Sequence, residues 1–269
     1  MHFQLTNFST SASPEHDISG TGPVRLLLIG PKRAGRSSVG NTLLGGLSFD
    51  TWGGSSTTVA HGSFDGRQLT VVDTYGWGTE ENNVPKKEKL ELLNSLSLCD
   101  PGPQALLLVL PLLQFTRSDR TALQKRMELL TEGVWRHTMV VFTLGDRLQG
   151  QMIQEFLQQG GEHMDWLLTK CRYRYRVLNN KTPFDRAQVS GLLDRVEDML
   201  MENGYWHFSL HMYRRLEEEW NRREKEILEA MEKEKEKEKG RRETSLPIYQ
   251  KRTALTIGND ELLKVVNHG

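Results

Sequence analysis

Residues 24–44 read VRLLLIGPKRAGRSSVGNTLL: a short apolar run, a glycine-rich turn and the start of a helical pattern. The turn Gly30–Ser37 matches the phosphate-binding loop pattern G-x-x-x-x-G-K-[ST], except that Arg36 occupies the lysine position. In such loops successive backbone amides surround phosphate oxygens, and the following helix adds the partial positive charge of its N-terminus. The stretch therefore predicts a phosphate site after the first strand of an α/β fold, with an ordinary glycine-rich turn as the alternative.

Beyond this stretch, short apolar runs alternate with helical patterns. Such alternation is typical of a mostly parallel sheet covered by helices on both faces, which makes a three-layer α/β domain. Asp65-Gly66 lies between VAHGSF and RQLTVV and predicts a hairpin turn, so that one edge pair of the sheet is antiparallel. The expected strands are Val24–Ile29, Leu69–Val72, Ala105–Leu110, Thr138–Phe142 and Tyr175–Leu178, and the expected helices include Ser37–Leu44, Lys86–Leu98 and Arg117–Leu130.

Three further motifs lie where strands of this sheet are expected to end. Asp73-Thr74-Tyr75-Gly76 has the D-x-x-G pattern of GTPase switch regions, in which the carboxylate reaches the Mg²⁺ shell and the glycine amide meets a γ-phosphate. Thr57 or Thr58, in the loop before it, offers a hydroxyl to the same metal. Asp146 lies where a carboxylate accepts from both N–H donors of guanine, and adenine offers no matching pair. Asn180 follows the last strand, where a loop would cap the base.

Composition limits the classes of protein to which the chain can belong. It has 269 residues with 35 basic and 35 acidic side chains, and 37% of its residues are hydrophobic. Zero net charge argues against a general nucleic-acid binder, which is normally basic. Two cysteines, Cys99 and Cys171, are too few for a disulfide scaffold and indicate a reducing compartment, the cytoplasm. No apolar run approaches the ~20 residues of a membrane-spanning helix, and the N-terminal stretch has no signal-peptide pattern.

The composition changes near Arg214, where a strongly charged segment begins. From Arg214 to Glu243, 22 of 30 residues are charged, 11 of each sign, while Leu216, Trp220 and Ile227 keep a helical spacing. This pattern predicts an amphipathic helix that ends near Gly240. The alternatives for its role are a solvated arm folded against the domain, a coiled coil and a helix in peripheral contact with a membrane. The expected parts are a flexible lead (residues 1–22), an α/β domain (23–204), a charged helical extension (205–243) and a flexible tail (244–269).

These motifs and the segments between them resemble the immunity-associated GTPases of the GIMAP family, a septin-like branch of P-loop GTPases. The match is carried by LLLIGPKRAGRSSVGNTLLG, VVDTYGW, MVVFTLGDRL and DPGPQALLLVL followed by FTRSDR, and it spans residues 24–213. The resemblance implies binding of GTP or GDP with Mg²⁺, and assembly as a homo- or heterodimer through the switch face. Mg²⁺ would be held by Ser37, Thr57 and Asp73, the last through water. The nucleotide site would comprise Gly30, Ala34, Gly35, Arg36, Ser37, Ser38, Thr57, Thr58, Asp73, Gly76, Asp146 and Asn180.

Departures from the family pattern bear on turnover. Arg36 replaces the loop lysine, Tyr75 replaces the proline of D-T-P-G, and Leu144 replaces the basic residue beside the base reader. Trp77, rather than a glutamine, follows the D-x-x-G glycine. Because a guanidinium is bulkier than an ammonium, we expect Arg36 to swing outward and leave the phosphates to the loop amides and the metal. The prediction is guanine-nucleotide binding with slow or absent hydrolysis, and the alternatives are a pseudo-GTPase interaction module or an ATP-using P-loop enzyme.

Overall fold

The computed structural model describes residues 22–52, 56–78 and 83–244. The chain divides after Tyr213 into two compact units. The first unit contains the α/β domain, and the second contains most of the charged helix. Nearly all of the expected lead (1–22) and tail (244–269) lies outside the described residues.

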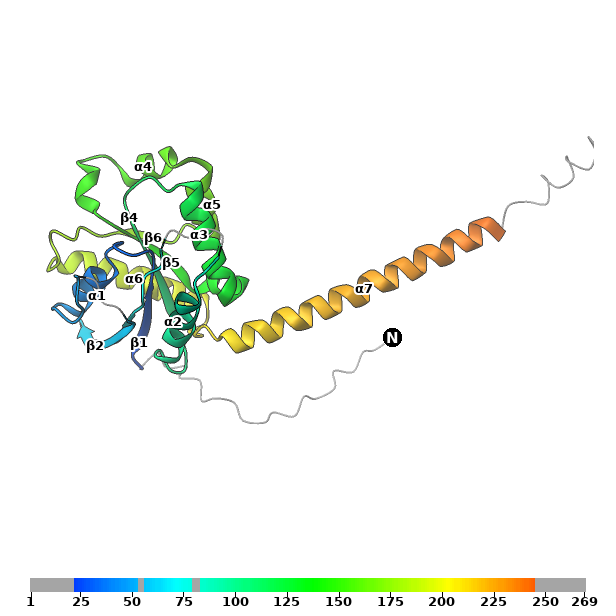
Figure 1. Ribbon diagram of the computed structural model, residues 1–269, viewed down its shortest axis with the longest axis horizontal. Coiled ribbons are helices and arrows are strands. Elements are labelled where there is room, and N and C mark those ends of the chain that lie inside the picture. Colours follow the sequence, from blue (N-terminus) through cyan, green and yellow to red (C-terminus); the bar gives the residue numbers. More distant parts are fainter. Residues whose placement is uncertain (1–21, 53–55, 79–82, 245–269) are drawn as a thin grey trace, which may run out of the picture. The chain divides into compact units, whose positions relative to one another are not determined.

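A six-stranded sheet forms the centre of the first unit, in the order β2-β3-β1-β4-β5-β6 (Figure 1). Neighbouring strands are parallel except β2 and β3, which form an antiparallel pair around Asp65 and Gly66. These two residues have φ values of 48° and 80°, as a two-residue type I′ hairpin turn requires. The prediction of a mostly parallel sheet with one antiparallel edge pair is confirmed. The strands are β1 (Val24–Ile29), β2 (Thr58–Phe64), β3 (Arg67–Asp73), β4 (Ala105–Pro111), β5 (Thr138–Thr143) and β6 (Tyr175–Val177).

Helices cover both faces of the sheet and give the domain three layers (Figure 1). Successive side chains of β1 point to opposite faces, so that Leu26 and Leu28 belong to one buried cluster and Leu27 and Ile29 to another. The first cluster is covered by α1 (Arg36–Leu44) and α6 (Arg186–Glu202). The second is covered by α2 (Lys86–Ser97), α3 (Arg117–Met127), α4 (Ile153–Gln159) and α5 (Gly161–Lys170). Short 3₁₀ helices are η1 (Glu128–Leu130), η2 (Glu132–His137) and η3 (Gly145–Leu148). The predicted three-layer α/β fold is confirmed.

The order of the strands determines where a ligand site can form. β1 lies between β3 and β4, so the chain adds its later strands first on one side of β1 and then on the other. In open parallel sheets, ligands bind beyond the carboxyl ends of the strands at such a reversal of strand order. The loop after β1, the segment after β3 and the loops after β5 and β6 all begin at this edge.

The first unit ends in an aromatic cluster at the start of α7 (Leu210–Thr244). The rings of Phe208 and Tyr213 stack with their centroids 5.4 Å apart. The hydroxyl of Tyr213 lies 3.0 Å from Nε2 of His137, which is buried. These contacts anchor the first turn of α7 to the last residue of η2, just before the start of β5.

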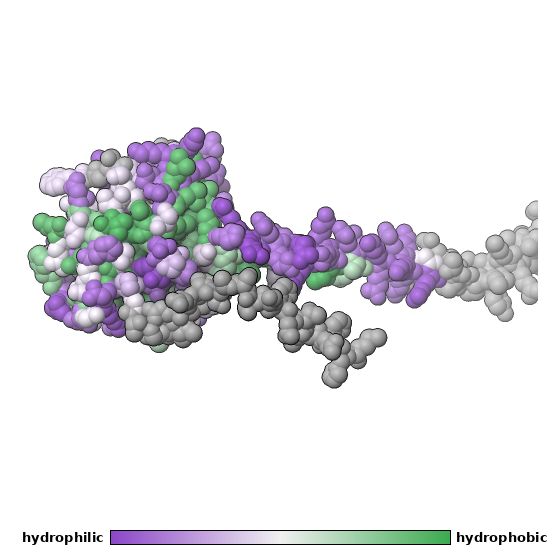
Figure 2. Space-filling view, turned by 90° about the horizontal axis from the view of Figure 1, so that it is seen from below, coloured by the Kyte–Doolittle hydropathy of each residue, from purple (hydrophilic) through white to green (hydrophobic). Residues whose placement is uncertain are grey.

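Within the second unit, α7 is a single charged helix. Glu219 pairs with Arg222 and Arg223 one turn further along, and Figure 2 shows a mostly hydrophilic surface on this helix. The prediction that the helix ends near Gly240 is wrong, because α7 continues to Thr244. One interior glycine costs about 1 kcal/mol, and the good helix formers on both sides carry the helix across it. No helix among the described residues has the length and apolarity needed to cross a bilayer.

Candidate functional site

The loop between β1 and α1 turns tightly over the edge of the sheet. Gly30 has a φ of 155°, and a Cβ atom there would overlap the carbonyl oxygen of Val109 on β4. At the other end of the loop, Thr143 of β5 donates from Oγ1 to the carbonyl oxygen of Ala34 at 2.7 Å. The loop is therefore fixed between β4 and β5, and glycine at position 30 permits this close approach.

The N-terminus of α1 follows directly from this loop. Gly35 precedes the helix and supplies no side-chain cap, and the first turn has no acidic residue. By contrast, Thr116 caps α3 and Asp185 caps α6 through side-chain hydrogen bonds. Ser37 and Ser38 lie in the first turn of α1 and are half-buried. The first amides of α1, together with the partial positive charge of the helix, favour an anion in front of the loop.

Arg36 turns into the loop rather than away from it. Its Nη1 donates to the carbonyl oxygens of Gly30 at 2.8 Å and Pro31 at 2.6 Å, and its Nε donates to Oδ1 of Asp73 at 3.3 Å. The side chain is 11% exposed, and burial lowers the pKa of the guanidinium although Asp73 opposes this shift. The prediction that Arg36 swings outward is wrong, because carbonyl and carboxylate oxygens accept its hydrogen bonds inside the loop.

The segment after β3 is bonded to the same loop. A Cβ atom at Gly76 would overlap the guanidinium of Arg36, so the D-x-x-G glycine makes room for this side chain. The next residue, Trp77, forms a parallel bridge with the loop: Lys32 N donates to Trp77 O at 2.8 Å, and Trp77 N donates to Gly30 O at 3.3 Å. The loop and this segment are thus joined through both a side chain and the backbone.

The predicted first-switch threonines lie at the start of β2, the strand that pairs with β3. Oγ1 of Thr57 donates to Oε2 of Glu91 at 2.8 Å and accepts from the backbone N–H of Tyr75 at 3.3 Å. Thr58 is exposed at the start of β2 and is the register partner of Asp73 on β3. The structure therefore places both threonines next to the D-x-x-G segment in space, but the Thr57 hydroxyl is hydrogen-bonded to Glu91 of α2.

The predicted Mg²⁺ ligands are chemically suitable but already bonded to protein groups. Ser37 Oγ donates to Oδ2 of Asp73 at 2.5 Å, and Oδ1 of the same carboxylate is paired with Arg36. Burial raises the pKa of Asp73, while its hydrogen bonds to Ser37 and Arg36 oppose the rise. Oxygen donors of this kind suit Mg²⁺, which demands a near-octahedral set. In this arrangement the residues do not fit the ion, because a guanidinium occupies the carboxylate that would face it.

A buried ion pair anchors the segment after β3 from behind. The backbone N–H of Gly78 donates to Oε1 of Glu88 at 2.9 Å, and Oε2 of Glu88 accepts from Nη2 of Arg126 at 2.7 Å. The guanidinium of Arg126 also lies 6.0 Å from the centre of the Trp77 ring. Sequence reasoning missed this pair, because the two residues lie on different helices and belong to no motif. Charged residues at core-facing positions of α2 and α3 were the only available signal.

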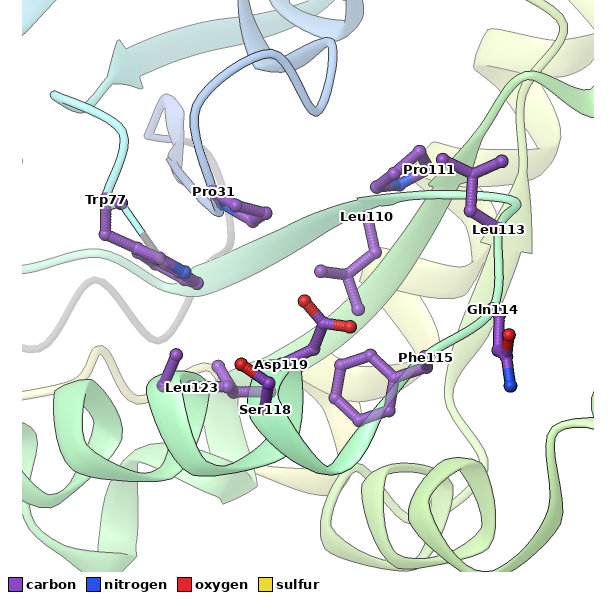
Figure 3. A pocket seen from close by; sticks show the side chains of 12 residues that line it. Pro31, Trp77, Leu110, Pro111, Leu113, Gln114, Phe115, Ser118, Asp119 and Leu123 are labelled. Carbon is purple, nitrogen blue, oxygen red and sulfur yellow. The ribbon is translucent and has the colours of Figure 1, made fainter. Parts of the chain in front are cut away.

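An apolar pocket of about 280 Å³ lies beside Trp77 (Figure 3). None of the site residues predicted from the sequence lines it. The pocket shares Pro31 with the phosphate loop, and the carboxylate of Asp119 is its acidic group. It is therefore a neighbour of the loop rather than part of the predicted nucleotide position. Its lining residues are Pro31, Trp77, Gly78, Leu110, Pro111, Leu113, Gln114, Phe115, Ser118, Asp119, Ala122 and Leu123.

The loops after β5 and β6 bring together the two predicted base-reading residues. Asn180 Oδ1 accepts from the backbone N–H of Leu144 at 3.3 Å, which links the two loops. Lys181 Nζ lies 2.7 Å from Oδ2 of Asp146. This hydrogen bond holds the pKa of Asp146 below its ordinary range, so the carboxylate is ionised at neutral pH. Sequence reasoning gave Lys181 no role, because its partner Asp146 lies on a different loop, far away in the sequence.

The strand order, the loop after β1 and the D-x-x-G segment after β3 place the first unit in the class of P-loop GTPase folds. Comparison with known proteins then gives the family. The AIG1 family model matches residues 24–227, and the chain belongs to the AIG1 family.

Individual relatives agree with this assignment. The chain is 27% identical over 205 residues to GTPase IMAP family member 8 of Homo sapiens, covering 73% of this chain and 29% of that protein. It is 31% identical over 194 residues to immune-associated nucleotide-binding protein 5 of Arabidopsis thaliana, covering 69% of this chain and 64% of that protein. The predicted resemblance to the GIMAP family is confirmed. The chain spans less than two thirds of the length of either relative.

A solved structure shows the same fold at low sequence identity. The crystal structure of a dimerization-deficient mutant of Toc33 from Arabidopsis thaliana aligns with a TM-score of 0.52 and 17% identity. The alignment covers 66% of this chain and 84% of the Toc33 chain.

Proposed function

We propose that this chain binds guanine nucleotides, that the bound nucleotide controls its assembly, and that it hydrolyses GTP slowly or not at all. The observation that carries the proposal is the link between the phosphate loop and the base loops. Thr143, whose hydroxyl holds the carbonyl of Ala34, is followed after two residues by Asp146. A ligand with a phosphate at one end and a base at the other therefore fits this edge of the sheet.

The base loops favour guanine over adenine. Asp146 is ionised beside Lys181, so that its carboxylate accepts hydrogen bonds and donates none. Guanine presents two adjacent N–H donors to such an acceptor, whereas adenine does not. Asn180 fixes the backbone just before Asp146 by accepting from Leu144. In this proposal Asp146 reads the base and Asn180 positions its loop.

Slow turnover follows from the residues around the second switch segment. Hydrolysis needs an oriented water molecule and a group that stabilises charge in the transition state. Trp77 offers a buried indole where a water-positioning side chain would be needed, and its backbone is bonded to the loop. Arg36 is held by Asp73 and two carbonyl groups. The same contacts favour the second candidate function, a pseudo-GTPase that keeps the fold as an interaction module.

The proposal extends to the organisation of the whole chain. The nucleotide-binding domain comprises residues 23–204 and pairs with a second domain of its kind through the switch face. Residues 205–243 form the helical extension, whose Leu216, Trp220 and Ile227 provide a seam for a coiled coil. A reducing location, the cytoplasm, suits two buried free cysteines whose burial raises the thiol pKa to about 12.

The deciding experiment is calorimetric titration of the protein with GTP, GDP and ATP. We expect binding of GTP and GDP with similar affinity and no measurable binding of ATP. Equal affinity for ATP and GTP would contradict the role of Asp146, and brisk GTP hydrolysis in the same preparation would contradict slow turnover. Absence of binding for all three nucleotides would leave the pseudo-GTPase as the function.

Asp146→Asn tests the base reader directly. The variant replaces a charge-assisted acceptor with a neutral amide, which should cost about 1.5–3 kcal/mol, or roughly 10- to 100-fold in affinity, for GTP and GDP alike. Asp194→Asn is the matched control, because Asp194 is an exposed carboxylate on α6. Unchanged affinity in Asp146→Asn, or an equal loss in the control, would remove Asp146 from the site.

A further inference from the structure

We propose that Arg36 takes the place of the divalent cation, so that this chain binds guanine nucleotide without Mg²⁺; this inference rests on the proposed function. In the general P-loop arrangement a lysine and a metal ion share the neutralisation of the phosphates. Here the guanidinium of Arg36 contacts Asp73, which was expected to face the metal, and also the loop carbonyl groups of Gly30 and Pro31. The two roles would therefore fall to one side chain.

The first step is the occupation of the metal position. Oδ1 of Asp73 accepts from Nε of Arg36 at 3.3 Å, and Oδ2 accepts from Ser37 at 2.5 Å. Both oxygens of the carboxylate and the hydroxyl of Ser37 are thus bonded within the protein. The side chains of Arg36 and Asp73 are 11% and 9% exposed, so the pair is shielded from water. A dication that approached this carboxylate would meet a fixed positive charge at short range.

The second step is the supply of donors to a phosphate. A guanidinium has five N–H donors. Nε uses one on Asp73, and Nη1 uses two on the carbonyl oxygens of Gly30 and Pro31. Nη2 bonds to none of the residues that the structure describes and lies beside Gly76, the glycine expected to meet the terminal phosphate. Its two N–H groups can form charge-assisted hydrogen bonds to phosphate oxygens, which are short and strong.

The third step compares arginine with lysine. A lysine has one ammonium group, which is a compact point charge without the separated donors of a planar guanidinium. It cannot hold Asp73 from one nitrogen while bonding the loop carbonyls from another. With lysine at position 36, the Asp73 carboxylate is released toward Ser37 and an ion. Arg36→Lys should therefore convert metal-independent binding into metal-dependent binding.

The experiment measures GDP affinity by calorimetry in two media. One contains MgCl₂ at about 5 mM, enough to saturate ordinary Mg²⁺ sites, and the other contains excess EDTA. For the unmodified protein we expect the dissociation constant to differ by less than about threefold between the two media. For Arg36→Lys we expect Mg²⁺ to tighten binding by about tenfold or more. Arg33→Lys is the matched control, because Arg33 is an exposed arginine of the same loop, and it should behave like the unmodified protein.

Each result has a distinct consequence. Tightening by Mg²⁺ of about tenfold or more in the unmodified protein, equal to that in Arg36→Lys, would overturn the inference and leave the proposed function intact. Absence of GDP binding to every protein in both media would overturn the proposed function, and the inference with it. A second measurement needs no variant: the electron paramagnetic resonance spectrum of Mn²⁺ added to the GDP complex. Free aqueous Mn²⁺ is the expected signal, whereas stoichiometric bound Mn²⁺ would overturn the inference.

Discussion

The buried pair of Glu88 and Arg126 offers a sharp test of how the segment after β3 is held. Their side chains are 7% and 2% exposed, and their charged groups lie 2.7 Å apart. Glu88→Gln keeps the shape of the side chain and retains an oxygen for the N–H of Gly78, which donates to Glu88 at 2.9 Å. The change therefore removes the negative charge and little else. It takes away the Glu88 carboxylate that accepts from Nη2 of the buried Arg126 guanidinium.

The expected cost follows from burial. Removal of one partner of a buried ion pair destabilises a protein by about 3–5 kcal/mol, because the remaining charge is uncompensated. Such a loss is a large share of the ~5–15 kcal/mol that holds a domain together. Replacement of both partners, in Glu88→Gln with Arg126→Met, removes the buried guanidinium as well. We expect the double variant to be more stable than Glu88→Gln alone.

Denaturant unfolding monitored by circular dichroism measures these differences, provided that the transition is two-state. Glu155→Gln, at an exposed position on α4, is the control and should change the free energy of unfolding by less than about 0.5 kcal/mol. A cost below about 1 kcal/mol for Glu88→Gln would refute the reasoning. So would a double variant that is no more stable than Glu88→Gln alone, because two residues that share an ion pair must be coupled.

Two further predictions concern pH and the second unit. Burial lowers the pKa of His137 to about 4 from 6.5, so the unfolded chain binds more protons between these values. Stability should therefore fall as the pH drops from about 6.5 to about 4, by at most about 3 kcal/mol, and His137→Gln should lack this part of the profile in denaturation at several pH values. Removal of residues 214–269 should lower the melting temperature or the oligomeric state, because the seam at Leu216, Trp220 and Ile227 needs an apolar partner. Light scattering and thermal scans that show no change would mean that the seam is solvated.

The fold could be predicted because its signals are local. The apolar runs that became β1, β4 and β5 are continuous, and strands buried on both faces have this pattern. Asp65-Gly66 specified its turn through residues that tolerate positive φ. The proposed phosphate loop and base loops could be predicted because each motif directly follows a strand. Sheet geometry then brought their residues to one edge.

The contacts that set the chemistry could not be predicted in the same way. Arg36 was recognised as a departure, but its direction depends on Asp73 and Gly76, which approach it only through the pairing of β1 with β3. The chemistry of a guanidinium alone does not determine whether the side chain turns into the loop or out to solvent. The same limit applies to Lys181 beside Asp146 and to Glu91 beside Thr57, since each pair joins segments that no pattern relates.

Besides the hydrogen bond from Ser37 to Asp73, two links join the loop after β1 to the D-x-x-G segment, and they make Arg36 a clean position to test. One link is the side chain of Arg36, which bonds to Asp73 and lies against Gly76. The other is the backbone of Trp77, which bonds to Gly30 and to Lys32. Arg36→Lys removes the first link and leaves the second, so the loop keeps its position on the sheet edge. A change in the metal dependence of nucleotide binding would therefore report the donor geometry of the cation at position 36 rather than a collapse of the loop.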